Sequence, residues 1–235
     1  MNKNNSTLSP GKLPALPNDA SKLTKWLTIS LYVSILTSAV CAIFGLYEYQ
    51  LLTDFKNGAD AAEDVILAAI NSSDNRQLIM ALVRMITYLI VLFLFMRFVY
   101  RASQNIWRSG AQGLKYSSGW AVGWFFVPAA NLVRPYQVMQ EIWKVSKNPR
   151  CWNQEPIDSV LSWWWYSFIS SAILNRVSIQ LSKRAENVDE FITASLCASG
   201  VSIVYILFSF LTIIVVIRIH RMQKLSFRAA SGTLS

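Results

Sequence analysis

Residues 78–96 read LIMALVRMITYLIVLFLFM, an apolar run interrupted by a single arginine. A run of this length is about what a helix needs to cross a hydrocarbon core of roughly 30 Å. Three similar runs occur at 26–47, 159–181 and 194–217. Because a backbone in lipid must satisfy its own hydrogen bonds, each run is predicted to be a transmembrane helix. The predicted fold class is therefore all-α, an integral membrane four-helix bundle.

The composition agrees with a membrane domain. The chain has 235 residues, of which 53% are hydrophobic and 15% are charged, whereas about 25% of residues are charged in a soluble domain. The four runs and their connections predict one membrane domain over 26–220. Residues 1–25 are expected to form a disordered cytoplasmic tail, and residues 221–235 a second cytoplasmic tail. The net charge of +9 follows the membrane sides, so anionic lipids are the expected partners and nucleic acid is not.

The distribution of charge predicts the orientation. Basic residues concentrate in both tails and in the central loop that starts at Arg97, whereas the first loop is acidic. Cytoplasmic flanks of membrane proteins carry the excess of Lys and Arg. Both termini and the central loop are therefore expected on the cytoplasmic side. The acidic side chains of the first loop are Glu48, Asp54, Asp60, Glu63, Asp64 and Asp74.

The segment 116–133, YSSGWAVGWFFVPAANLV, competes as a fifth span. Gly119, Gly123 and Pro128 would interrupt a helix there, and the run is short. A crossing would also move the basic residues that follow it to the outside. We therefore predict a re-entrant or interfacial hairpin on the cytoplasmic side, and the sequence leaves these two forms open.

The stretch 134–147 alternates polar and apolar residues with helical periodicity, which predicts an amphipathic helix. Asn131 is expected to cap it, with Pro135 in its first turn. The helix is expected to lie in the interface plane, with Tyr136 and Trp143 at the depth of the headgroups.

Basic and aromatic residues around this hairpin form a candidate face for lipid or for a partner protein. A lipid-facing surface and a specific site for a protein partner both remain open, and a homo-oligomer is a further alternative. The candidate residues are Arg97, Arg101, Asn105, Arg108, Trp120, Trp124, Pro128, Asn131, Arg134, Pro135, Tyr136, Glu141, Trp143, Lys144 and Lys147.

Several strings in this region carry a resemblance to a known family. They are YRASQN at 100–105, GWAVGWFFVP at 119–128, NLVRPY at 131–136, EIW at 141–143 and WWW at 163–165. Their order and spacing resemble the bacterial domain-of-unknown-function family 4328, over about residues 80 to 217. The resemblance implies a multi-pass bacterial membrane protein, and we expect it in the bacterial cytoplasmic (inner) membrane. It implies no activity, because the family has none assigned.

Catalytic motifs are not visible in the sequence. His220 is the only histidine, which argues against bis-His haem ligation and His-rich metal sites. Cys41, Cys151 and Cys197 form no CxxC pair and are expected to be free thiols. With no phosphate loop or nucleophile elbow, we expect no catalytic residue, no metal, no cofactor and no enzymatic activity.

Polar residues within the predicted spans give a second candidate site, made of Arg84, Asn175 and Arg176. Arg84 is expected to snorkel to the outer headgroups. The alternative is that it faces the bundle, bonded to the third span or to Glu48. Serines also recur at helical spacing in three spans, which indicates close helix packing or a polar pathway.

Two functions follow from these patterns. The leading prediction is a non-enzymatic module that binds lipid or a partner protein at the cytoplasmic face. The alternative is a small oligomeric channel or transporter that uses Arg84 and the hydroxyl-lined helix faces.

Overall fold

The computed structural model describes residues 20–57 and 63–232, and every regular element in these ranges is a helix. The all-α class is therefore confirmed. The long helices are α1 (Ser21–Lys56), α2 (Glu63–Arg108), α5 (Ser159–Arg184) and α6 (Val188–Gly232). Between α2 and α5 lie α3 (Ser118–Gly123) and α4 (Arg134–Lys147), with short 3-10 turns η1 (Ala130–Leu132) and η2 (Trp152–Gln154).

The helices continue well beyond the predicted spans. α2 has 46 residues and is about 69 Å long at 1.5 Å per residue, more than twice the thickness of a hydrocarbon core. The prediction of disorder is wrong for residues 21–25, which belong to α1, and the predicted C-terminal tail starts as helix, because residues 221–232 continue α6. The helices extend there because Leu23, Ile219 and Gln223 are buried against other helices, which favours continued helix. The rest of the N-terminal tail lies outside the described residues.

Three of the helices are long and apolar enough to cross a membrane. They are α1 over Ser21–Asp54, α2 over Leu78–Arg108 and α6 over Val188–Ser226. These three helices suggest a membrane protein. α5 also has sufficient length but contains Asn175, Arg176 and several serines, which lower its hydropathy.

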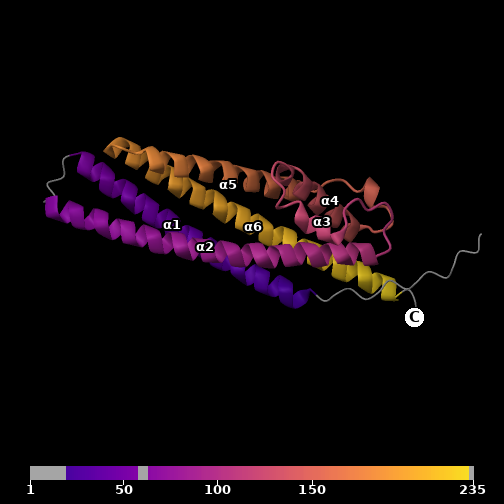
Figure 1. Cartoon of the computed structure of the whole chain (residues 1–235). Coiled ribbons are helices and arrows are strands. Elements are labelled where there is room, and N and C mark those ends of the chain that lie inside the picture. Colours follow the sequence, from indigo (N-terminus) through magenta and orange to yellow (C-terminus); the bar gives the residue numbers. More distant parts are fainter. Residues whose placement is uncertain (1–19, 58–62, 233–235) are drawn as a thin grey trace, which may run out of the picture.

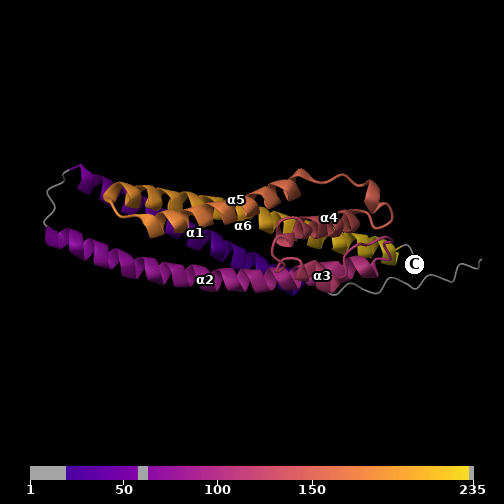
Figure 2. The same ribbon diagram turned by 45° about the horizontal axis from the view of Figure 1, so that its top comes forward.

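α6 lies at the centre of the molecule, with α1 and α5 packed against it (Figures 1 and 2). α1 runs antiparallel to α6, as shown by the pairs Ser21–His220, Ser34–Ser209 and Lys56–Asp189. α2 packs along α1, and residues 109–158, hereafter the module, cover one end of α2 and α6. The module therefore adds a second layer to one end of the bundle, which we call the module end.

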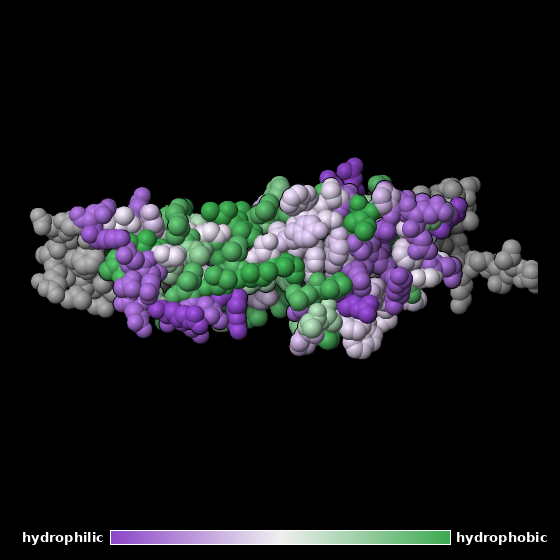
Figure 3. Space-filling view, turned by 90° about the horizontal axis from the view of Figure 1, so that it is seen from above, coloured by the Kyte–Doolittle hydropathy of each residue, from purple (hydrophilic) through white to green (hydrophobic). Residues whose placement is uncertain are grey.

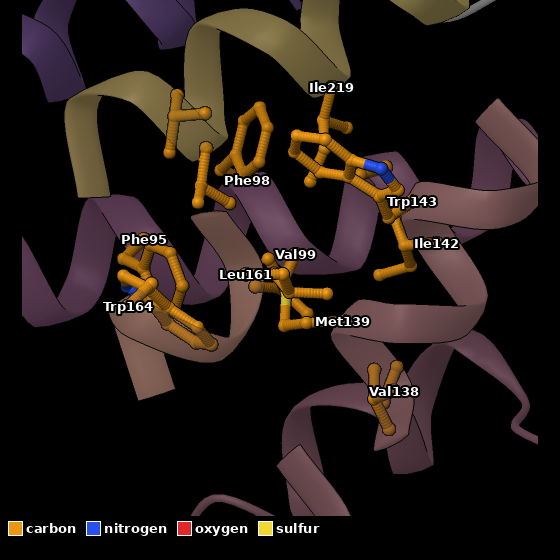
Figure 4. Close-up of a cluster of buried hydrophobic side chains, with 14 of the residues drawn as sticks. Phe95, Phe98, Val99, Val138, Met139, Ile142, Trp143, Leu161, Trp164 and Ile219 are labelled. Atoms are coloured by element: carbon orange, nitrogen blue, oxygen red, sulfur yellow. The ribbon is translucent and has the colours of Figure 1, made fainter. Parts of the chain in front are cut away.

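A buried apolar cluster lies where the module packs on α2 and α6 (Figure 4). Phe98 and Val99 of α2 share it with Met139 and Ile142 of α4, and Phe95 lies beside Trp164 of α5. α2 changes character at this point, because large apolar residues between 78 and 93 are exposed on most of its sides. Figure 3 shows apolar residues over the middle of the molecule and hydrophilic residues toward both ends. Such a belt is expected where lipid replaces protein as the neighbour.

Candidate functional site

The module contains a hairpin that rises along α2 and turns back. Trp107 Nε1 donates to the Tyr116 carbonyl at 2.9 Å, and the rings of Phe125 and Phe95 lie 6.0 Å apart. Phe95 and Trp107 are about 18 Å apart along the α2 axis, so the chain climbs this distance between 116 and 125. The backbone N–H of Lys115 donates to Glu141 of the returning helix α4 at 2.8 Å. Both ends of the hairpin therefore lie at the module end.

The tip of the hairpin is a strained turn. Ala129 has φ 63° and ψ −42°, and the N–H of Ala130 donates to the Pro128 carbonyl at 2.8 Å. This is the geometry of a γ-turn with positive φ, which is rare for a residue with a side chain. Such strain persists only where the surrounding contacts enforce it.

The start of α4 differs from the expected cap. Val133 occupies the N-cap position without a side-chain hydrogen bond, so the prediction that Asn131 caps the helix is wrong. Asn131 lies in η1, where its N–H donates to the Val127 carbonyl. The 3-10 turn moves Asn131 too far upstream to reach the first turn of α4. Pro135 does occupy that first turn, where a missing N–H costs nothing.

The apolar face of α4 packs against protein and not against lipid. Trp143 is 3% exposed, and Val138 and Met139 are also buried. Tyr136 stacks on Trp165 with 5.7 Å between ring centroids, and its hydroxyl pairs with Ser162 at 2.8 Å. The expectation that α4 turns this face to lipid is therefore wrong, and the depth of Tyr136 and Trp143 at the headgroups stays a prediction. α2 and α6 extend past their apolar runs and offer this face a protein surface.

Glu141 anchors the rising limb to the returning limb. Its buried carboxylate accepts backbone N–H bonds from Lys115 at 2.8 Å and Tyr116 at 3.3 Å. Burial raises the pKa of the Glu141 carboxyl, and the two N–H donors oppose that rise. The side chain thus holds the base of the hairpin closed.

An aromatic and cationic cluster covers the outside of the hairpin. The Tyr116 hydroxyl donates to Gln137 Oε1 at 2.7 Å, and Arg134 Nη1 donates to both of their oxygens. The Arg134 guanidinium lies 5.5 Å from the centre of the Trp124 ring, within the range of a cation–π contact. Trp124 in turn lies 4.9 Å from the ring of Trp120. Arg134 therefore holds both limbs together at the surface.

Large apolar side chains at the end of the hairpin remain uncovered. They are Trp120, Phe126, Leu132 and Val133, which we call the apolar tip. Phe126 is 62% exposed and Trp120 is 56% exposed. Exposed apolar side chains gathered at a turn are unusual on a soluble surface, where they mark contact with protein or membrane.

The predicted lipid or partner face is divided by the structure. Asn105, Pro135, Glu141 and Trp143 are buried and support the fold. Lys147 is exposed but pairs with Glu155 at 2.6 Å, which lowers the pKa of that carboxyl. The partly buried members are Arg101, Trp124, Asn131, Tyr136 and Lys144, and the other exposed members are Arg97, Arg108, Trp120, Pro128 and Arg134.

Phe126, Leu132 and Val133 were not among the predicted site residues. Their position beside Pro128 at the turn was the signal that could have identified them.

Three helices share a buried polar contact that the sequence analysis did not identify. Gln223 of α6 accepts from Asn105 Nδ2 at 3.0 Å, and its amide donates to Ser146 Oγ and the Ala102 carbonyl, each at 3.1 Å. Ser226 Oγ donates to the Ser146 carbonyl at 2.9 Å. These bonds join α2, α4 and α6. A glutamine beyond an apolar run gives no pattern from which such a contact could be predicted.

Arg84 faces α6 and not the headgroups. Its Nη2 donates to Ser202 Oγ at 2.7 Å, and its guanidinium lies 5.6 Å from the centre of the Tyr205 ring. The expectation that Arg84 snorkels is therefore wrong, because α6 offers a hydroxyl and a ring within reach. The alternative also named other partners, because Ser202 and Tyr205 belong to α6, whereas the third apolar run forms α5 and Glu48 belongs to α1.

The other two members of the predicted intramembrane site lie apart from Arg84. Among the described residues, no hydrogen bond or ion pair connects Asn175 or Arg176 to it. Arg176 is exposed on α5 and lines a shallow hollow with Gln180, Lys183 and Arg184. Arg84 therefore forms a separate site with α6.

Many of the serines in the long helices serve close packing. Ser30, Ser167 and Ser199 each donate to a carbonyl of their own helix. Gly45 of α1 approaches α6 so closely that a Cβ on it would overlap Ser199 Oγ. Small residues allow such close approach between helices in lipid.

The three span-length helices and the apolar belt suggest a helical membrane protein. The chain belongs to the family described as "Domain of unknown function (DUF4328)", which matches residues 62–221. This range contains Arg84 and the whole module, whereas α1 lies outside it. Neither a curated protein nor a solved structure matches the chain.

Proposed function

We propose that the protein is a four-span protein of the bacterial inner membrane, with α5 as the fourth span, and that its module binds anionic lipid at the cytoplasmic face. The module has no enzymatic activity in this proposal. The exposed apolar tip is the observation that carries it. The tip inserts into the inner leaflet while neighbouring cations contact lipid phosphates.

The position of the tip along the bundle supports insertion. The closely spaced exposed apolar side chains of α2 end at Phe93, and Arg97 follows one turn later. Phe125 packs on Phe95, so the turn of the hairpin lies at this boundary. Trp163 and Tyr166 at the start of α5 are exposed near the same level, as the Tyr136–Ser162 bond indicates. Aromatic side chains are enriched at such interfaces.

Charge at the module end supports the choice of anionic lipid. Arg97, Arg108 and Lys115 are exposed there. The acidic groups are compensated, because Glu155 pairs with Lys147 and Asp158 pairs with Arg218. Each basic residue near an anionic surface is worth about 1 kcal/mol, and salt screens the effect.

Spin labels at two positions test insertion of the tip. In a cysteine-free chain reconstituted into phosphatidylglycerol vesicles, a nitroxide at Phe126 should be accessible to oxygen and protected from a water-soluble nickel chelate. A nitroxide at Arg150, also exposed in the module, is the control and should show the reverse. Equal accessibility at the two positions would reject insertion.

Charge reversal tests the lipid preference. Arg97→Glu with Arg108→Glu should reduce the binding of phosphatidylglycerol relative to phosphatidylcholine in detergent. The matched control is Lys183→Glu with Arg184→Glu, since these exposed residues lie at the other end of the bundle. An unchanged preference in the first pair would reject the module end of the bundle as the lipid site.

The contact of Arg84 with α6, within the apolar part of α2, favours a channel or transporter as a second candidate function. The serines that bond to their own helices argue against a hydroxyl-lined path. Uptake of an anion into proteoliposomes that depends on Arg84 would support this candidate over the lipid module.

A further inference from the structure

We propose that Arg84, held by Ser202 and Tyr205, binds a phosphate oxyanion at the lipid-facing seam between α2 and α6. This site is separate from the module. It lies in the part of α2 whose apolar side chains are exposed.

The depth of Arg84 favours an anionic partner. The path along α2 from Arg84 to Arg97 measures about 20 Å at 1.5 Å per residue. If Arg97 marks one edge of a hydrocarbon core of about 30 Å, Arg84 lies about 10 Å inside the other edge. A guanidinium at that depth is costly unless it is paired.

The contacts of Arg84 leave most of its donors available. A guanidinium carries five N–H donors. Ser202 accepts from one nitrogen, and the Tyr205 ring lies against the guanidinium carbon. Among the described residues, Arg84 forms no ion pair with a carboxylate. The Ser202 hydroxyl donates to the Ala198 carbonyl at 3.0 Å, so its oxygen is fixed as an acceptor for Arg84. Ser202 therefore orients the guanidinium and leaves its other edge for a ligand.

The surroundings of Arg84 define how a ligand reaches it. Arg84 is only partly buried, and its neighbours Val83 and Met85 are exposed. The site therefore opens sideways to the surface of the bundle. A planar guanidinium matches two oxygens of a phosphate. The oxyanion can come from a phospholipid of the outer leaflet or from free phosphate.

Three ligands separate these sources in thermal unfolding of the full-length protein in detergent. They are phosphatidylglycerol, diacylglycerol with the same acyl chains, and inorganic phosphate. We expect phosphatidylglycerol to raise the melting temperature more than diacylglycerol does, because only the former carries the phosphate. An equal rise with inorganic phosphate would assign the site to a free oxyanion. No phosphate-dependent rise with either source would overturn the proposal.

The Arg84→Leu variant should need roughly tenfold more ligand to reach the same phosphate-dependent rise in melting temperature. Arg176→Leu is the matched control, since it removes an exposed arginine from another helix, and it should retain the wild-type response. Equal responses of the two variants would overturn the proposal.

Ser202→Ala provides a second variant if Arg84→Leu fails to fold. It keeps the charge but removes the acceptor that orients it, so a weaker response is expected, and an unchanged one would count against the proposed geometry. A variant of α2 beside the module, Arg97→Glu with Arg108→Glu, should keep the part of the response that Arg84→Leu loses. That result separates this site from the proposed lipid site of the module.

Discussion

Asn105 of α2 donates a hydrogen bond from its side-chain amide to Gln223 of α6 at 3.0 Å, with both side chains almost fully buried. Gln223 also bonds to Ser146 of α4 and to the Ala102 carbonyl. One glutamine thus connects the two long helices to the returning limb of the hairpin. The position of the module on the bundle depends on this polar contact as well as on apolar packing.

Gln223→Leu should destabilise the protein by at least about 2 kcal/mol, because each buried polar group left without a partner costs roughly 1–3 kcal/mol. Thermal unfolding in detergent measures the effect. The control is Lys224→Leu, an adjacent exposed position, where a change within about 0.5 kcal/mol is expected. Similar stabilities of the two variants would show that Gln223 does not hold the module in place.

Glu141 should make stability depend on pH. Its folded pKa is raised above the ordinary value of 4.5, so the folded state binds more protons than the unfolded state in the window just above 4.5. Stability from this group therefore falls as pH rises through that window. The side chain of the Glu141→Gln variant cannot titrate, so the melting temperature of this variant should not fall in the same pH range. The wild-type minus variant difference, measured from pH 4.5 upward, isolates Glu141.

Glu155 provides the opposite sign within the same molecule. Lys147 lowers its pKa, so its contribution is present above 4.5 and is lost as pH falls below that value. The Glu155→Gln variant should therefore still lose stability as the pH rises above 4.5. If the Glu141→Gln variant also loses stability in that range, another group causes the loss.

Ala129→Gly should stabilise the hairpin by about 1 kcal/mol, because glycine adopts the positive φ of 63° without the steric cost that alanine bears. The neighbouring change Ala130→Gly is the matched control. Ala130 lies in η1, where glycine gains nothing and adds backbone entropy to the unfolded state. Opposite signs of the two changes in melting temperature are expected, and equal destabilisation would contradict a strained turn at 129.

The parts of the fold that depend on local pattern could be predicted from the sequence. The four apolar runs are helical because their length and composition are local properties. The helix predicted at 134–147 coincides with α4, because Pro135 and the periodicity lie within the segment itself.

The parts that depend on neighbours could not be predicted. The same amphipathic pattern at 134–147 suits a lipid surface or a protein surface, and only the extension of α2 and α6 decides between them. The direction of Arg84 depends on where Ser202 and Tyr205 lie after folding. Gln223 has no periodic signal at all, because its partners come from distant helices.

Gly45 and Ser199 should show coupled effects. Alanine at 45 would overlap Ser199 Oγ, whereas the next nearest atoms lie at 3.5 Å, an ordinary contact. Gly45→Ala in the Ser199→Ala background should therefore gain helix propensity of up to about 1 kcal/mol. In the wild-type background the overlap should cancel or reverse that gain. Additive effects in a double-mutant cycle of melting temperatures would contradict the close approach of α1 and α6.

Cysteine labelling should resolve whether α5 crosses the membrane. The four-span arrangement places Arg134 before α5 and Asn187 after it on opposite sides, because the basic module is retained in the cytoplasm. In a cysteine-free chain in intact cells, a cysteine at Asn187 should react with an impermeant thiol reagent added outside, and cysteines at Lys115 and Arg134 should react only after permeabilisation. Labelling of Lys115 and Arg134 from different sides would mean that the hairpin crosses. Protection of Asn187 from the outside, together with Arg134, would leave α5 on the cytoplasmic surface and reduce the spans to α1, α2 and α6.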